Sequence, residues 1–151
     1  MTAQVPEVLY YDNQKLSMCS VPLMDYFTLA NIEPKFRVDC TALWRGYVGT
    51  WEIIDGRLYL IGIEGHFENG NEVNLSSIFP EFPDRVFAHW YSGKIRAPRG
   101  ELIDYVHGGF ASVYEQDIIF KVKKGMIVDT KIKNNEAQPN DYESDDLEDI
   151  F

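Results

Sequence analysis

Hydrophobic and polar positions alternate along much of the chain in short runs, the period expected of half-buried β-strands. The clearest run covers residues 51–60, where Asp55-Gly56 separates two β-prone segments. A two-residue type I′ turn needs positive φ at both central positions, so this pair predicts a β-hairpin. The register that follows pairs Ile53 with Leu58, Trp51 with Leu60, Glu52 with Tyr59 and Ile54 with Arg57. The first two pairs should face the core.

Two further hairpins are expected. Residues 117–132 contain a glycine at 125, which favours a three-residue loop over 123–125 with Gly125 in the left-handed region. That loop would pair Val122 with Met126 and Phe120 with Val128. Near the start, two β-prone runs flank residues 12–14, whose Asp, Asn and Gln give a weaker turn signal.

The rest of the pattern is mainly strand-like. Residues 85–98 and 100–115 read as strands broken by Pro98 and Gly100, and Gly108-Gly109 predicts a bulge or tight bend. Residues 22–32 could form one or two helical turns, and residues 74–83 a short 3₁₀ turn. The predicted fold is mainly β: an antiparallel sandwich or a partly open small barrel, since long crossover helices are lacking.

Charge divides the chain into two parts. Residues 1–133 hold all fourteen Lys and Arg and seventeen acids, a net charge of −3, whereas residues 134–151 hold seven acids and no base. The sequence thus predicts one β-rich domain over 1–133 and an acidic disordered tail over 134–151. The near-neutral domain lacks the concentrated basic surface that nucleic-acid binding requires.

Composition restricts location and chemistry. No apolar run approaches the length of about 20 residues that a membrane span needs. The first residues show no basic segment followed by an apolar one, so a cytoplasmic location is expected. Cys19 and Cys40 are too few for a disulfide framework or a zinc site, and the pattern indicates no cofactor.

Unusual side chains are densest over residues 44–52. On an extended strand Arg45 and Tyr47 would share a face with Trp51, and together with Trp44 they could hold a planar ligand through stacking and a guanidinium contact. The alternative is that the aromatic residues fill the core and Arg45 lies against them, which the hairpin register favours for Trp51.

Arg96 belongs to a second aromatic and basic stretch, residues 89–99. Such a stretch could contribute to stacking of bases or sugars. It also has the alternation of a half-exposed strand, which is the competing interpretation.

Catalytic signals are weak. His107 precedes two glycines that would let a ligand approach, and Glu115 lies on an adjoining strand-like segment, so the two are candidates for general acid and base. A structural histidine beside a bulge is the alternative. The three histidines lack the short spacings of metal ligands, and no metal site is expected. An enzyme is not the favoured interpretation.

The tail ends in "SDDLEDIF", in which acids precede apolar residues at the terminus. This end resembles the acidic tips of single-stranded-DNA-binding proteins from bacteria and some phages, although those tips carry proline before the last phenylalanine. The resemblance implies docking into a basic pocket of a replication or repair enzyme. Phe151 would be the anchor and Ile150 a second contact, with an electrostatic rim formed by Asp145, Asp146, Glu148 and Asp149.

These observations favour a non-enzymatic protein-interaction module whose tail docks on, or is steered to, a basic surface of another protein, with nucleic-acid-processing proteins among the candidates. Two alternatives stay open. One is a small-ligand or nucleotide-binding protein, or an enzyme, with an aromatic pocket containing Arg and His. The other is a single-stranded nucleic-acid binder or a nucleic-acid mimic.

Overall fold

The structure of the chain is a computed structural model that describes residues 3–106, 110 and 112–135. Its elements, in chain order, are β1 (Glu7–Tyr11), β2 (Gln14–Met18), α1 (Pro22–Ala30), the 3₁₀ turn η1 (Thr41–Leu43), β3 (Tyr47–Ile54), β4 (Arg57–Gly65), α2 (Leu75–Ile78), β5 (Val86–Phe87), β6 (Gly93–Asp104), β7 (Val113–Lys123) and β8 (Met126–Asn134). The mainly β class is therefore confirmed.

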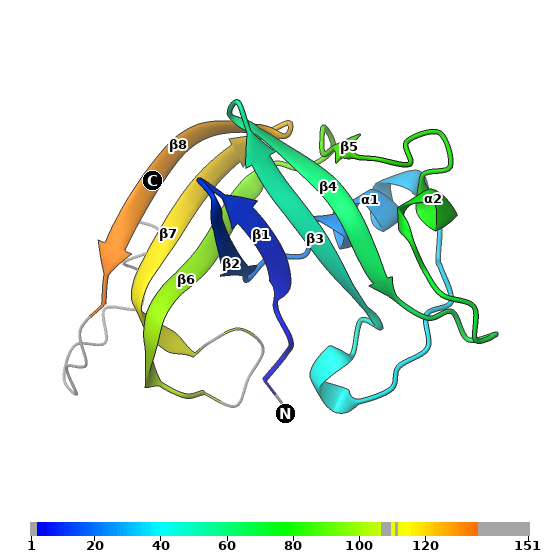
Figure 1. The fold of residues 1–151 in the computed structure, drawn as a ribbon, viewed down its shortest axis with the longest axis horizontal. Coiled ribbons are helices and arrows are strands. Elements are labelled where there is room, and N and C mark those ends of the chain that lie inside the picture. Colours follow the sequence, from blue (N-terminus) through cyan, green and yellow to red (C-terminus); the bar gives the residue numbers. More distant parts are fainter. Residues whose placement is uncertain (1–2, 107–109, 111, 136–151) are drawn as a thin grey trace.

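All eight strands belong to one open sheet with the order β2-β1-β3-β4-β8-β7-β6, and β5 pairs with β4 (Figure 1). The sheet curls so that its two ends approach each other. The backbone N–H of Cys19, just after β2, donates to the carbonyl oxygen of Arg96 in β6 at 2.8 Å. Of the two expected architectures, this single curled sheet agrees with the partly open barrel and not with a two-sheet sandwich.

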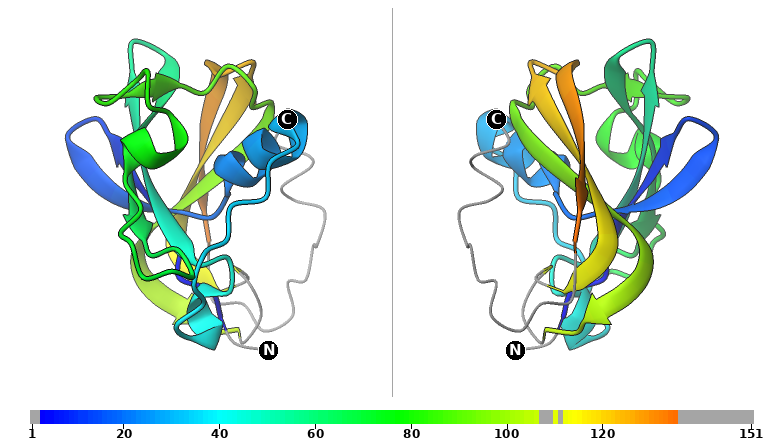
Figure 2. Two further views of the ribbon diagram at one scale, coloured as in Figure 1. Left: turned by 90° about the vertical axis from the view of Figure 1, so that its right-hand side faces the viewer. Right: turned by 90° about the vertical axis from the view of Figure 1, so that its left-hand side faces the viewer.

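One strand pair departs from the antiparallel expectation. Strands β1 and β3 are parallel, with Leu9 beside Trp51. The chain returns between them through β2, α1 and residues 31–46, so a short helix and an irregular segment suffice for the crossover. Figure 2 shows this segment running from α1 along the molecule to η1.

Two of the predicted hairpins are confirmed. Asp55 and Gly56 have φ values of 52° and 71°, and all four predicted pairs between β3 and β4 occur. The first apolar face lies in the core as expected, with Trp51 and Leu60 fully buried. The hairpin predicted near the start of the chain is also confirmed. Strands β1 and β2 pair antiparallel, and Asp12 and Asn13 in the turn between them both have positive φ.

The predicted register of the β7–β8 hairpin is wrong by one residue at the turn and by two residues beyond an irregularity at Lys121, where Phe120 faces Thr130 instead of Val128. The loop has two residues, Lys124 and Gly125, so that Lys123 faces Met126 and Val122 faces Ile127. Neighbouring backbone groups hold this shorter turn. Gly125 N–H donates to the Tyr91 carbonyl, and the Gly125 carbonyl accepts from Leu58 N–H, each at 2.9 Å. These contacts compensate for the energetic cost of the φ of 50° at Lys124, since a positive φ is unfavourable for residues other than glycine.

Strand breaks and helices were predicted less well than hairpins. Strand β6 continues through Pro98 and Gly100 with an irregular register after Arg99, where two breaks were expected. Helix α1 occupies the predicted region, but residues 75–78 form a one-turn α-helix rather than a 3₁₀ turn. Strand β8 extends through Asn134, the first residue of the expected tail. The predicted bend at 108–109 lies outside the described residues.

We predict that Gly125→Ala destabilises the protein more than Gly56→Ala does. Both glycines have positive φ, which costs alanine about 1 kcal/mol. A Cβ on Gly125 would also lie 2.7 Å from the Ala88 carbonyl oxygen, whereas one on Gly56 would meet nothing within 4 Å. Urea unfolding should show a loss of about 1 kcal/mol for Gly56→Ala and at least about 2 kcal/mol for Gly125→Ala. Equal losses would contradict the packing of the turn.

Candidate functional site

The aromatic and cationic residues at 44–47 do not lie on one extended strand. A turn at Gly46, with a φ of 83°, separates Arg45 from Tyr47, where β3 begins. Trp44 is 70% exposed, whereas Tyr47 is fully buried. The Arg45 guanidinium lies 5.7 Å from the centroid of the Tyr47 ring. The structure thus places Tyr47 and Trp51 in the core with Arg45 against them, and leaves Trp44 outside.

A residue that the sequence did not single out, Glu7 at the start of β1, organises this region. Its carboxylate is fully buried. One oxygen accepts from Arg45 Nη2 at 2.8 Å and from the Gly49 N–H at 2.7 Å. The other oxygen accepts from Trp51 Nε1 at 3.3 Å. These contacts join β1 to its parallel neighbour β3 and to the segment that precedes it.

Gly49 makes room for this carboxylate. A Cβ at this position would lie 2.6 Å from Glu7 Oε1 and 2.9 Å from Trp51 Nε1. Glycine inside a strand often marks such a close approach, so Gly49 was the sequence signal for a buried partner. Nothing in the sequence identified Glu7 as that partner, because its place in an alternating run also fits a solvent-facing position.

Burial raises the pKa of Glu7 above its ordinary value, and Arg45, the Gly49 N–H and the Trp51 indole partly offset that rise. All three groups donate to the carboxylate and none of these contacts offers an acceptor to a carboxyl proton, so the ionised form fits the site. Burial also raises the pKa of Tyr47. Its hydroxyl and the Nε of Arg45 have no hydrogen-bond partner among the described residues.

A cavity of about 1200 Å³ lies against this cluster, between α1, the segment that follows it and the start of β3. We call it the aromatic cavity, because five of its lining residues carry aromatic rings. Its lining consists of Gln4, Val21, Met24, Phe27, Thr28, Asn31, Ile32, Glu33, Pro34, Phe36, Thr41, Trp44, Arg45, Tyr47 and Phe110. The rings of Phe36 and Tyr47 are 5.0 Å apart, and those of Phe27 and Tyr47 are 6.1 Å apart.

Several polar side chains of the aromatic cavity are used within the fold. Gln4 donates from Nε2 to the Thr41 carbonyl and accepts from the Trp44 N–H. The Thr28 hydroxyl donates to the Met24 carbonyl, one helical turn earlier. Arg45 is held by Glu7. The walls therefore offer mainly apolar and aromatic surface to a ligand.

Apolar side chains also reach the surface around the cavity. Three of the exposed large hydrophobic residues, Met24, Ile32 and Trp44, belong to its lining. Exposed apolar groups that gather at one concave site are typical of a binding surface, whereas scattered ones are ordinary.

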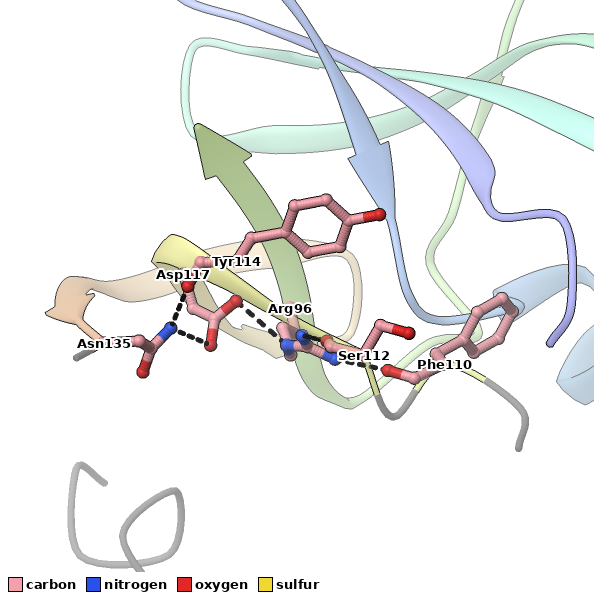
Figure 3. A network of polar contacts seen from close by, with 6 residues as sticks. All are labelled: Arg96, Phe110, Ser112, Tyr114, Asp117 and Asn135. Atoms are coloured by element: carbon pink, nitrogen blue, oxygen red, sulfur yellow. Dashed lines mark hydrogen bonds and ion pairs between the residues drawn. The ribbon is translucent and has the colours of Figure 1, made fainter. Parts of the chain in front are cut away.

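Arg96, the other predicted binding residue, takes part in a separate network (Figure 3). Its Nε donates to Asp117 Oδ1 at 2.9 Å, and its Nη atoms donate to the carbonyls of Phe110 and Ser112. The side chain of Asn135 donates to Asp117 Oδ2 at 3.0 Å. Arg96 does not line the aromatic cavity, but it holds the backbone of Phe110, which does.

The structure does not test the pairing of the catalytic candidates His107 and Glu115. His107 lies outside the described residues. Glu115 is exposed and its carboxylate accepts from the Glu101 N–H at 2.7 Å. Among the cysteines, Cys40 is exposed, and burial raises the pKa of the Cys19 thiol to about 11, so that this thiol stays protonated near neutral pH.

The predicted docking residues of the tail, Asp145, Asp146, Glu148, Asp149, Ile150 and Phe151, lie outside the described residues. Their role stays a prediction.

Within the described part of the chain, no three His, Cys, Asp or Glu side chains form a group that could hold a metal ion. None of the described helices is long and apolar enough to cross a membrane. Comparison with known proteins finds no matching family model, no matching curated protein and no matching solved structure.

We predict that Arg45→Met destabilises the protein by about 3–5 kcal/mol at pH 8, because it leaves the buried Glu7 carboxylate without its counter-charge. Loss of that charge should raise the pKa of Glu7 further. A carboxyl whose pKa is higher in the folded than in the unfolded state stabilises the fold below its unfolded pKa and loses that contribution as pH rises through the folded pKa. Urea unfolding should therefore show a smaller loss at pH 5 than at pH 8. A loss that is equal at both pH values would count against the buried ion pair.

Proposed function

We propose that this protein binds a largely apolar small molecule in the aromatic cavity. The observation that carries the proposal is the cavity itself, about 1200 Å³ in volume and lined by five aromatic residues next to the curled sheet. Ligand sites are commonly concave, mostly apolar and placed at the mouths of curled sheets.

The hydrogen bonds of the polar lining residues also favour a largely apolar ligand. Gln4, Thr28 and Arg45 already have partners within the fold, so recognition would depend on stacking and apolar contact more than on new hydrogen bonds. Aromatic rings supply large contact areas at small conformational cost, and Trp44, an exposed residue of the lining, would contact a bound molecule. A neutral molecule with one or more rings fits these walls best.

This proposal takes up the ligand-binding alternative that the residues at 44–47 suggested. Trp44, Arg45 and Tyr47 all belong to the cavity, but in different roles. Trp44 would contact the ligand directly. Tyr47 forms part of the wall behind Phe27 and Phe36, and Arg45 holds the segment in place through Glu7.

Binding of the neutral fluorescent probe N-phenyl-1-naphthylamine tests the proposal. Trp44→Ala should weaken the probe's affinity roughly tenfold, about 1.4 kcal/mol, because an aromatic wall is lost. Since Trp44 is 70% exposed, the substitution should change the free energy of unfolding little. Phe82→Ala is the matched control, because Phe82 is 51% exposed and lies outside the cavity lining. Equal affinities for both variants would refute the proposed site.

A further inference from the structure

Asn135, the last described residue, is fixed to the fold at a place connected to the aromatic cavity. Its backbone N–H donates to the Glu115 carbonyl at 2.8 Å. Its side-chain amide donates to the Tyr114 carbonyl at 2.9 Å and to Asp117 Oδ2 at 3.0 Å. Residues 136–151 therefore start from a defined point of the sheet.

The same network ends on a wall of the cavity. Asp117 accepts from Arg96, and Arg96 in turn donates to the Phe110 carbonyl. Figure 3 shows these side chains in one connected group, with the Phe110 ring directed away from Arg96. Because Phe110 lines the aromatic cavity, a chain of three hydrogen-bonded side chains connects the start of the last segment to that cavity.

Residues 136–151 are long enough to reach it. These sixteen residues span at most about 55 Å when fully extended, and would span about 20–25 Å as a flexible chain. A tether of this length gives its end an effective concentration near the millimolar range, so that even weak contacts with the cavity would be occupied.

The composition of the chain end matches the cavity and its border. Leu147, Ile150 and Phe151 are apolar or aromatic, as the walls are, and four acids lie among them or just before them. Lys35 and Arg37 alternate with the lining residues Pro34 and Phe36 on the segment after α1. Their ion pairs, with Glu33 at 3.9 Å and Asp39 at 2.8 Å, are solvent-exposed, so exchange for other acids costs little.

We propose that Leu147, Ile150 and Phe151 dock into the aromatic cavity of their own chain and compete there with the small molecule. The inference rests on the proposed function, because it uses the same cavity. Phe151 and Ile150 contact the aromatic walls, and the neighbouring acids face Lys35 and Arg37. Ligand binding then displaces the chain end and exposes it, and a partner that captures the chain end frees the cavity.

Probe binding to full-length variants tests this competition. Ile150→Ser with Phe151→Ser should bind N-phenyl-1-naphthylamine about fivefold more tightly than the native chain, because the competing side chains are removed. Tyr142→Ser is the matched control, since it removes an aromatic residue of the same segment outside the last five residues, and it should leave the affinity unchanged. A synthetic peptide of residues 141–151 should weaken probe binding to the double variant. The same peptide with both serines should not.

The outcomes separate the two proposals. If the double variant and the native chain bind the probe equally while Trp44→Ala still weakens it, self-docking is overturned and the ligand site stands. If the difference in probe affinity between the native chain and the double variant grows with protein concentration, the cavity is occupied by the chain end of a second copy. That result also overturns the inference. If the probe binds neither the native chain nor any variant, the proposed ligand site is refuted. Docking is then tested by NMR, by following the Trp44 indole N–H resonance while the peptide is added to the double variant. A saturable shift supports docking and its absence refutes it.

Discussion

Glu7 places a carboxylate where no water reaches it, and the local structure follows from satisfying that charge. Its oxygens accept from the Arg45 guanidinium, the Gly49 N–H and the Trp51 indole. These donors come from β3 and from the turn before it, so the contact fixes the parallel pairing of β1 with β3. Breaking such a pair by removing one partner is costly, since the remaining charge stays buried. The geometry of the cavity wall depends on this contact.

Two guanidinium groups, each held by a carboxylate, stabilise walls of the aromatic cavity. Arg45, held by Glu7, separates buried Tyr47 from exposed Trp44. Arg96, held by Asp117, fixes the backbone of Phe110. Each pair is shielded from solvent and directional, so it is suited to keep an aromatic side chain in one position while the cavity between them stays open.

The sequence predicted local structure better than the arrangement of distant residues. The β3–β4 hairpin followed from Asp55-Gly56 alone, because a type I′ turn determines its own register. The register of the β7–β8 hairpin could not be predicted from its turn residues in the same way. Backbone hydrogen bonds of Gly125 with Tyr91 and Leu58 select a shorter loop than the local sequence favours. Glu7 was missed for the same reason: its partners lie about 40 residues away in the chain.

The candidate site was predicted in part. Trp44, Arg45 and Tyr47 were recognised as unusual, and all three belong to the cavity lining. The different places of the three residues could not be predicted from strand alternation, because the turn at Gly46 interrupts it. Trp44 is an exposed part of the wall, Arg45 is held by Glu7, and Tyr47 is in the core. Arg96 was a candidate for ligand contact, with a half-exposed strand as the alternative, and it pairs with Asp117, a partner supplied by the next strand. The cavity depends on α1 packing beside these residues, which no local pattern encodes.

The Glu7–Arg45 pair positions the wall of the aromatic cavity in addition to stabilising the fold. Replacing both residues by apolar ones, Glu7→Leu with Arg45→Met, removes the two charges together and should largely preserve the stability of the fold. Calorimetric titration of this folded double variant with N-phenyl-1-naphthylamine is the most direct test. The affinity of the double variant should be at least several-fold weaker than that of the native chain. Native affinity in the folded double variant would contradict this role of the pair.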